Sequence, residues 1–363
     1  MAIPFIDLQR QYRYLEPQIK LRINRVLEHG QYIMGPEVEE LEETLRQYVG
    51  AKHCITVASG TEALLISLMA LRIKPGDEII TTPFSFAATA EVIVRLGAKP
   101  VFVDIEADTC NINASLIAEK ITNKTRAIIP VSLYGQPADM DEVNAVASKN
   151  GNIPVVEDAA QSFGATYRGK KSCNLSLIGC TSFFPSKPLG CYGDGGAIFT
   201  SDDELALAMR EIRVHGQSHR YVHTRVGVGG RMDTIQCAIL LAKFGRFEWE
   251  VEQRIAIGKR YNDLFDLVER ARVRQRDDRT SIFAQYTVMT KERAKTQQRL
   301  ADIGIPTAVH YPKPLNRQAA FEGICCPECT PLAIEVAGSV LSLPMSPDLS
   351  RSQQDQIVAA LED

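Results

Sequence analysis

Short apolar runs alternate with helical patterns through the first two thirds of the chain. HCITVA (53–58), DEIITTP (77–83) and KPVFVDI (99–105) are such runs, and Gly, Pro or Asp residues bound them. Between them, TEALLISLMAL (61–71) and AATAEVIVRLG (87–97) carry apolar residues at helical spacing. Strands that alternate with helices in this way are typical of βαβ units. The pattern therefore predicts an α/β fold with a mostly parallel central sheet.

The same alternation continues to about residue 216. Further predicted strands are 125–135, 153–160, 180–184 and 195–201, and further predicted helices are 141–151 and 201–216, the latter with a Ser/Asp cap. Residues 232–268 then read as one long helix, and the rest mixes a strand (283–290) with a helix (292–304). We expect a large domain with an N-terminal arm over 1–240 and a small C-terminal α+β domain over 241–363.

Composition narrows the possible functions. The chain has 363 residues and a net charge of −3, which gives no basis for nucleic-acid or membrane-surface binding. No apolar stretch of 18 residues is present, and the N-terminus lacks a signal-peptide core. The nine cysteines form no evident disulfide framework, so we expect a cytoplasmic protein. CCPEC (325–329) resembles half of a zinc site, but no second pair follows it, and we predict no metal.

Lys187 is the only positive charge in SFFPSKPLGCYGDGGAIF (182–199), a run rich in apolar residues, glycine and proline. Burial disfavours the ammonium form of a lysine, and a neutral lysine amine can form a Schiff base with a carbonyl group. Taken alone, the same lysine can also pack its stem and extend its ammonium to solvent.

The apolar strand within 153–160 carries Glu157 and Asp158 at its end. Ligands of open α/β sheets bind beyond the carboxyl ends of the strands. Asp158 is therefore placed to keep a pyridine nitrogen protonated, and Gln161 to reach a phenolic oxygen beside it. We interpret Glu157, on the opposite side of the strand, as structural. A helix N-cap is the other interpretation of Asp158.

Ser59, Gly60 and Thr61 lie between a predicted strand and a predicted helix. Backbone N–H groups and the helix dipole attract anions there, and hydroxyls from Thr61 and Ser182 would complete a phosphate cup. Plain capping of the helix is the alternative for this turn.

Together these features suit pyridoxal 5′-phosphate. That cofactor needs a lysine, an acid at its ring nitrogen, a phosphate cup and a flat residue over its ring. Phe84 or Phe86, in TTPFSFAAT, can supply the flat residue.

The motifs SGTEAL, EDAAQSFGA, SFFPSK-LG-YGDGGA and HYPKPL resemble the DegT/DnrJ/EryC1/StrS family of pyridoxal-phosphate-dependent sugar aminotransferases of fold type I, over essentially the whole chain. The resemblance implies that Lys187 bonds the cofactor covalently, that Asp158 and Gln161 contact its ring, and that Phe86 stacks on it. It also implies that Gly60, Thr61 and Ser182 bind its phosphate, and that the protein is a homodimer with shared active sites.

One position departs from the family pattern. The family commonly has Gly-x-Asn-x-Arg in a loop that reaches across the dimer, and its asparagine touches the partner's cofactor phosphate. Here the stretch reads GVGGRMD, so Gly229 stands at the asparagine position. Backbone N–H groups or water are the expected replacements for that contact.

Within the family, Pro188 after the lysine resembles the members that aminate C3 of UDP-2-acetamido-2-deoxy-3-oxo-glucuronate for O-antigen synthesis, with L-glutamate as the expected amino donor. Arg231, His310 and Tyr311 match the positions that hold the sugar carboxylate, and an arginine fork suits a carboxylate. An interface salt bridge is the alternative for Arg231, and a stiff loop with a packed tyrosine is the alternative for residues 308–315.

Three other functions stay open. A C4-ketosugar aminotransferase acting on another UDP-, dTDP- or GDP-linked sugar would have no carboxylate for Arg231 and His310 to hold. A sugar 3-dehydratase of this fold would carry histidine in place of Lys187. A non-catalytic regulatory protein would have no use for the set of Lys187, Asp158 and Gln161.

Overall fold

A computed structural model describes residues 3–361 of the chain as a mixed α/β protein. Residues 1–2 and 362–363, the outer ends of the two expected domains, lie outside the described residues. The α-helices are α1 (Leu8–His29), α2 (Pro36–Val49), α3 (Gly60–Ala70), α4 (Ala88–Arg95), α5 (Met140–Lys149), α6 (Asp203–Arg213), α7 (Thr234–Leu267), α8 (Arg293–Asp302), α9 (Pro331–Ser339) and α10 (Arg351–Ala359). Short 3-10 turns are η1 (Ala114–Leu116), η2 (Ala118–Lys120), η3 (Leu133–Gly135), η4 (Leu315–Arg317) and η5 (Ala319–Phe321).

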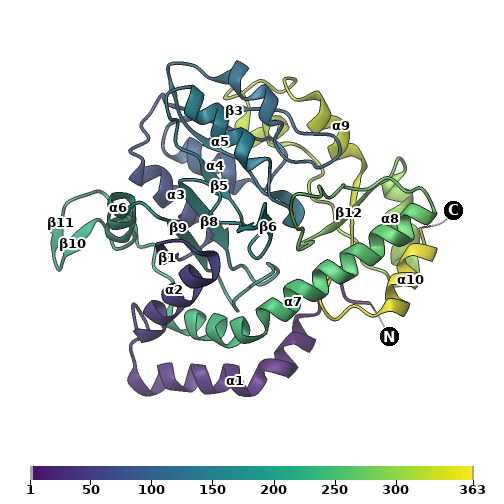
Figure 1. Ribbon diagram of the computed structural model, residues 1–363, viewed down its shortest axis with the longest axis horizontal. Helices are drawn as coiled ribbons and strands as arrows, with labels where there is room; N and C mark the ends of the chain where they lie inside the picture. Colours follow the sequence, from purple (N-terminus) through teal and green to yellow (C-terminus); the bar gives the residue numbers. More distant parts are fainter. Residues whose placement is uncertain (1–2, 362–363) are drawn as a thin grey trace.

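A central sheet organises the first two thirds of the chain (Figure 1). The strands of the molecule are β1 (His53–Val57), β2 (Glu78–Thr81), β3 (Lys99–Phe102), β4 (Thr125–Ile129), β5 (Val156–Asp158), β6 (Thr166–Tyr167), β7 (Lys170–Lys171), β8 (Ile178–Ser182), β9 (Gly196–Thr200), β10 (Gln217–His219), β11 (Val222–His223), β12 (Tyr286–Met289) and β13 (Val340–Leu343). Four of them pair in the order β1-β9-β8-β5 and three in the order β3-β2-β4. Parallel bridges between Ile128 and Val155 and between Val131 and Asp158 join the two groups.

The sheet is mostly parallel, as the pattern of strands and helices predicts. β2 pairs in parallel with β3 and β4, and β5 pairs in parallel with β8. Only β9 runs against its neighbours β1 and β8 among these paired strands. The reversal follows from the connection, since β8 and β9 are consecutive strands joined by residues 183–195. This segment, called the lysine loop below, contains Lys187.

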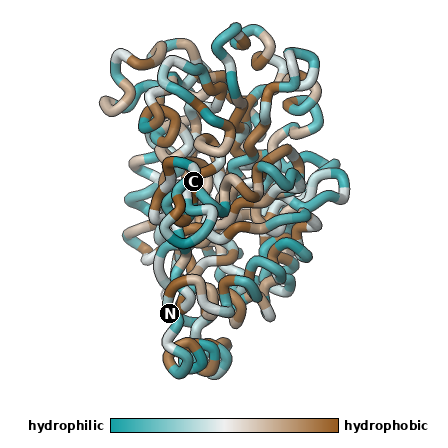
Figure 2. Tube along the Cα trace, turned by 90° about the vertical axis from the view of Figure 1, so that its left-hand side faces the viewer, coloured by the Kyte–Doolittle hydropathy of each residue, from teal (hydrophilic) through white to brown (hydrophobic). Residues whose placement is uncertain are grey.

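Side chains of alternate strand residues point to opposite faces of the sheet, and an apolar layer packs on each face. Ile55, Val57 and Ile198 pack with residues of α3 and α6 on one face. Cys54 and Phe199 pack with residues of α2 and α7 on the other. This two-sided burial explains why the strands read as continuous apolar runs. The hydropathy view shows the same arrangement, with hydrophobic residues concentrated inside the molecule (Figure 2).

The C-terminal third packs around a second, smaller sheet. β12 and β13 pair antiparallel, and their residues Val288 and Leu341 share an apolar cluster with Tyr261 of α7 and Ile357 of α10. α7 is the link, because its first half covers the large sheet and its second half enters this cluster (Figure 1). The expected domain boundary between residues 240 and 241 falls inside α7.

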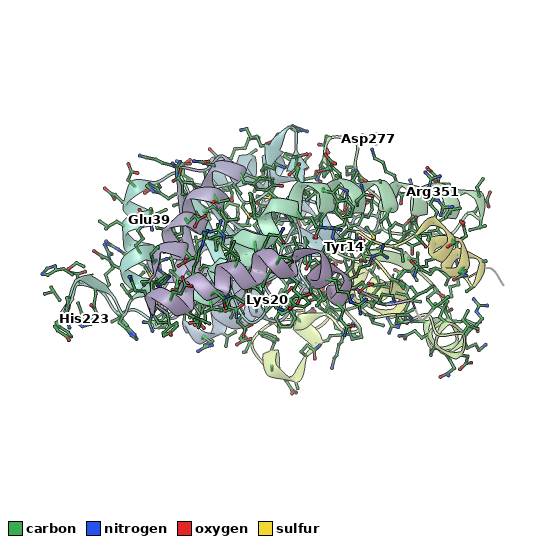
Figure 3. All side chains as sticks on the ribbon, turned by 90° about the horizontal axis from the view of Figure 1, so that it is seen from below. Tyr14, Lys20, Glu39, His223, Asp277 and Arg351 are labelled. Carbon is green, nitrogen blue, oxygen red and sulfur yellow. The ribbon has the colours of Figure 1, made fainter. Side chains whose placement is uncertain are left out.

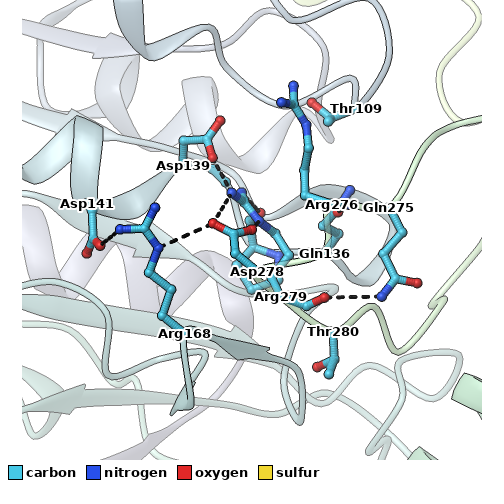
Figure 4. Close-up of polar contacts among 12 residues, drawn as sticks. Thr109, Gln136, Asp139, Asp141, Arg168, Gln275, Arg276, Asp278, Arg279 and Thr280 are labelled. Atoms are coloured by element: carbon cyan, nitrogen blue, oxygen red, sulfur yellow. Dashed lines mark hydrogen bonds and ion pairs between the residues drawn. The ribbon is translucent and has the colours of Figure 1, made fainter.

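A buried ion-pair network fastens the segment before β12 to the large sheet (Figure 4). Arg279 is 6% exposed, and its guanidinium contacts Asp139 and Asp278 and donates to the Pro137 carbonyl at 3.0 Å. Arg168 joins from the other side through Asp278 at 3.3 Å. The network holds residues 137–139, which follow η3, against residues 278–279.

The sequence pattern predicts no element for residues 8–49, where α1 and α2 lie. α1 runs along one edge of the molecule and packs on α7 (Figures 1 and 3). No helix within residues 3–361 is long and apolar enough to cross a membrane.

Candidate active site

The lysine loop folds back on itself and holds Lys187 at the sheet. The Lys187 N–H donates to the Phe184 carbonyl at 2.8 Å, and the Cys191 N–H donates to the Phe183 carbonyl at 2.8 Å. Lys187 is half-buried. Burial lowers the pKa of its amine below the ordinary value, and the negative charge of Asp158 opposes this shift. The amine is therefore closer to its neutral, nucleophilic form than a surface lysine.

Asp158 is the last residue of β5 and is 6% exposed. Its Oδ2 accepts a hydrogen bond from the Thr89 hydroxyl at 2.8 Å, and its Oδ1 accepts one from the Ala160 N–H at 3.2 Å. Burial raises the pKa of the Asp158 carboxyl, while the Thr89 hydrogen bond and the charge of Lys187 lower it. A protonated ring nitrogen placed against this carboxylate would stabilise its ionised form in the same way.

Gln161 is 4% exposed and joins two segments of the site. Its Oε1 accepts from the Tyr134 N–H at 2.8 Å, and its Nε2 donates to the Tyr311 hydroxyl at 3.0 Å. Burial raises the pKa of the Tyr311 hydroxyl, so the hydroxyl stays protonated at neutral pH. The Gln161 amide is thus fixed by two protein partners, Tyr134 and Tyr311.

His310 belongs to the same cluster. Burial, followed by the charge of Lys187, lowers the pKa of His310 to about 4. The ring is therefore neutral at neutral pH, and its Nδ1 lies 2.9 Å from the Ser342 hydroxyl oxygen. The carbonyl of His310 accepts a hydrogen bond from the Tyr134 hydroxyl, which holds this segment against the large sheet. The structure thus brings His310 and Tyr311 to the lysine.

The structure separates the two candidates for the flat residue. Phe84 is fully buried in an apolar cluster with Val131 and Leu133. Phe86 is 58% exposed, and its ring centroid lies 6.5 Å from that of Tyr311. An exposed ring at the edge of the site has a free face for stacking, whereas a ring inside the core has none. The geometry favours Phe86.

The turn before α3 lies against the end of β8. A Cβ on Gly60 would lie 2.7 Å from the Ser182 Cβ, so only glycine lets the two segments approach this closely. Ser59 caps α3, and its hydroxyl oxygen accepts the Glu62 N–H at 3.0 Å. Ser59, Gly60, Thr61 and Ser182 are all half-buried. The N-terminus of α3 and Ser182 are therefore in close contact, and none of these four residues is fully buried.

Arg231 lies in a different group of residues. Its Nη1 is 3.2 Å from Nε2 of His215, a residue that the sequence analysis does not single out. A Cβ on Gly229 would lie 3.1 Å from Cε1 of the same imidazole. The Gly230 carbonyl accepts from the Ala58 N–H at 2.9 Å, which ties this segment to the turn before α3. Arg231 thus contacts His215 of the same subunit.

Three residues that position the site escaped the sequence analysis: Thr89, Tyr134 and Ser342. Each is an ordinary hydroxyl residue in its local sequence, and each acts through a partner distant in the chain. Among the residues that the structure describes, no group of three or more His, Cys, Asp or Glu side chains is arranged to hold a metal ion.

Comparisons with known proteins identify the family of this chain. The sequence model of the DegT/DnrJ/EryC1/StrS aminotransferase family matches residues 14–362. UDP-2-acetamido-2-deoxy-3-oxo-D-glucuronate aminotransferase of Pseudomonas aeruginosa is 54% identical over 359 residues, which cover 99% of both chains. The chain therefore belongs to the DegT/DnrJ/EryC1/StrS aminotransferase family.

Two solved structures are similar over nearly the whole chain. DesV of S. venezuelae, in complex with a ketimine intermediate, has a TM-score of 0.96 and 36% identity, and the match covers 99% of this chain and 97% of that one. NtdA of Bacillus subtilis, with the bound cofactor PMP, has a TM-score of 0.90 and 29% identity, with 99% and 84% covered.

Proposed function

We propose that this protein is a pyridoxal-phosphate-dependent aminotransferase that transfers an amino group from L-glutamate to C3 of UDP-2-acetamido-2-deoxy-3-oxo-D-glucuronate, in O-antigen and lipopolysaccharide sugar synthesis. One arrangement carries the proposal: the buried Asp158 carboxylate at the end of β5 is held by the Thr89 hydroxyl and interacts electrostatically with the partly buried Lys187 amine. The full-length similarity to the P. aeruginosa enzyme supports the choice of substrate.

The residues present fit the cofactor. Lys187 supplies an amine of lowered pKa, Asp158 a buried carboxylate for a ring nitrogen, and Gln161 an amide beside it. Ser59, Gly60, Thr61 and Ser182 would hold the phosphate, and the exposed ring of Phe86 would stack on the cofactor ring. When bound, pyridoxal phosphate supplies a carbonyl that bonds amines and a ring that withdraws electrons from the adjacent carbon.

The chain's own residues supply the proton transfer and the orientation. With the cofactor bound, Lys187 Nζ would take the proton from the reacting carbon as a base and would then, as an acid, deliver it to a second carbon. Asp158, held by Thr89, keeps the ring nitrogen protonated. Tyr311, held by Gln161, and neutral His310 donate hydrogen bonds to the sugar carboxylate.

Arg231 completes the carboxylate site in our proposal by acting across a homodimer. Arg231 follows Gly229 in the segment that, by its resemblance to the family pattern, reaches across the dimer, so its guanidinium would serve the other subunit. Several apolar side chains are exposed and could be buried in such an interface; their exposed fractions are Leu21 55%, Leu27 52%, Tyr32 49%, Ile33 48%, Met34 42% and Val226 86%.

We also propose fold type I, with the division into a large domain over 1–240 and a small domain over 241–363. The mostly parallel sheet and the separate β12–β13 cluster support this division.

Incubation of the purified protein with L-glutamate and a panel of ketosugars, with products read by mass, tests the function. We expect amination of the 3-keto sugar acid. Activity only on neutral 4-keto sugars would support the C4 alternative. The Lys187→Ala variant should bind no cofactor covalently and show no turnover, and full activity of that variant would overturn the mechanism. A protein that stays colourless with pyridoxal phosphate would favour a regulatory role.

A further inference from the structure

Lys243 of α7 is a buried cation behind the lysine loop. It is 3% exposed, and its ammonium donates a hydrogen bond to the carbonyl of Gly190. Its Nζ also lies 5.2 Å from the centroid of the Tyr192 ring. Both contacts are with the lysine loop, so the charged end of Lys243 is directed at the segment that carries Lys187.

Gly190 and Lys187 both lie against the backbone carbonyl of Phe184. A Cβ on Gly190 would lie 2.5 Å from the Pro185 carbonyl oxygen and 2.7 Å from the Phe184 carbonyl oxygen. The same Phe184 carbonyl accepts the Lys187 N–H at 2.8 Å. Because the loop is closed this tightly, a force that holds Gly190 also holds the peptide group of Lys187.

Glu250 of α7 is the acidic group whose charge acts on Lys243. Glu250, two turns further along α7, is 3% exposed, and both of its carboxylate oxygens accept from Gln11 of α1, at 2.9 and 2.8 Å. A small cavity is lined by Gln11, Glu250 and Lys187 among others. α1 packs on α7 at Ile239 and Ala242 (Figure 3).

A charged side chain is not the residue of lowest free energy for the buried position 243. An apolar side chain of similar length would avoid desolvating a charge, and buried ion pairs are often no more stabilising than apolar replacements. The ammonium does offer one thing that an apolar chain cannot, a strong hydrogen bond to a loop carbonyl.

We propose that Lys243 is a positioning residue that fixes the lysine loop through the Gly190 carbonyl, so that the Lys187 amine stays within reach of the cofactor carbonyl. The inference rests on the proposed function, since it takes Lys187 as the residue that bonds the cofactor.

Two variants on the same helix test the proposal. Lys243→Met keeps the length of the side chain and removes the donor, whereas Lys259→Met removes an exposed lysine of α7 and serves as control. Hydrogen exchange of the cofactor-free protein is followed over residues 184–191, and the rate at which it captures added pyridoxal phosphate is followed by absorbance. Turnover of the reconstituted enzyme then separates kcat from KM.

For Lys243→Met we expect exchange in the loop to rise and cofactor capture to slow, each by about tenfold, the factor for one lost hydrogen bond. We expect kcat to fall with an unchanged KM for the ketosugar. Lys243→Arg, which keeps a charged donor, should recover much of this loss, and Lys259→Met should match the wild type. Loop exchange and capture at wild-type rates in Lys243→Met would overturn the proposal.

A second measurement decides the matter if Lys243→Met fails to fold. Glu250 and Arg254 of α7 and Cys191 and Tyr192 of the lysine loop face Lys243. Burial lowers the pKa of Lys243 to about 8, while burial raises that of Cys191 to about 11 and that of Tyr192 to about 12. Between pH 7 and 9.5 Lys243 therefore changes charge and the two loop groups do not.

In the wild type, loop exchange corrected for its intrinsic pH dependence should increase more across this range than in Lys243→Arg, because the titration of Lys187 is common to both proteins. Equal curves for the two proteins would refute the role of the charge. The outcome is separable from the proposed function: a wild-type protein that captures no pyridoxal phosphate contradicts that function, whereas equal capture by the wild type and Lys243→Met contradicts only the role of Lys243.

Discussion

Replacing Lys243 with Met should stabilise the protein at neutral pH and destabilise it at high pH. The pKa of Lys243 falls from an ordinary value of 10.5 to about 8 because the ammonium is buried. Each tenfold change in proton affinity corresponds to about 1.4 kcal/mol, so burying the charge costs about 3 kcal/mol below pH 8. The variant escapes this cost but loses the hydrogen bond to the Gly190 carbonyl, worth about 1 kcal/mol. The variant should therefore be more stable by about 2 kcal/mol at pH 7.

The sign of the effect reverses as the pH rises. Between pH 8 and 10.5 the unfolded chain binds more protons at this lysine than the folded chain, so the stability of the wild type increases with pH. Above pH 10.5 the lysine is neutral in both states, and only the lost hydrogen bond remains. The Lys243→Met protein should then be the less stable of the two by about 1 kcal/mol.

Thermal unfolding midpoints of the two cofactor-free proteins, measured side by side from pH 7 to 10.5, provide the assay. The difference between the proteins cancels the titration of all other groups. For a chain of this length 1 kcal/mol corresponds to about 1 °C, so the midpoints should differ by about 2 °C at pH 7 and cross between pH 8 and 10.5. A variant that is less stable by the same amount at every pH would refute the reasoning.

Three further predictions concern other residues. Thr89→Val removes a hydrogen bond that lowers the pKa of Asp158, so the acid limb of the pH–activity profile should move to higher pH and cofactor binding should weaken about tenfold in an equilibrium titration. Arg279→Met leaves Asp139 without its buried partner, and unfolding should become easier by about 3 kcal/mol, seen as a lower thermal midpoint (Figure 4). Phe86→Ala should weaken pyridoxal phosphate binding about fivefold, the equivalent of about 1 kcal/mol of stacking, with an unchanged midpoint for the cofactor-free protein.

The alternation of side chains along a strand explains why much of the site could be predicted. On β5, Asp158 turns toward Lys187, whereas its neighbour Glu157 turns away and accepts hydrogen bonds from Ser132 at 3.0 Å and Ser172 at 2.6 Å. Because side chains alternate between the two faces of a strand, the sequence alone assigns Glu157 and Asp158 to opposite faces. The same logic locates the turn at Ser59, because a strand followed by a helix places free N–H groups there.

Tertiary packing decides the rest, and local sequence does not encode it. Thr89 and Asp158 are 69 residues apart, and Tyr134 and His310 are 176 residues apart. Nothing in the sequence around Thr89 distinguishes it from a threonine that caps a helix. Whether Phe84 or Phe86 can stack on a cofactor likewise depends on which of the two rings is buried in the core. α1 escaped prediction for a related reason, since its helix presents apolar residues to α7 on one side and to solvent on the other.

His215 and Gly229 show how one departure from a family pattern can involve a second position. With glycine at 229, the imidazole of His215 comes close enough that a Cβ there would lie 3.2 Å from Nε2. The same nitrogen lies 3.2 Å from Nη1 of Arg231, and because an arginine only donates, the imidazole nitrogen accepts. A larger side chain at 229 would displace the imidazole and with it a support of the guanidinium. The missing asparagine is therefore coupled to the placement of Arg231, and the two positions are best understood as one unit of the cross-dimer segment that we propose.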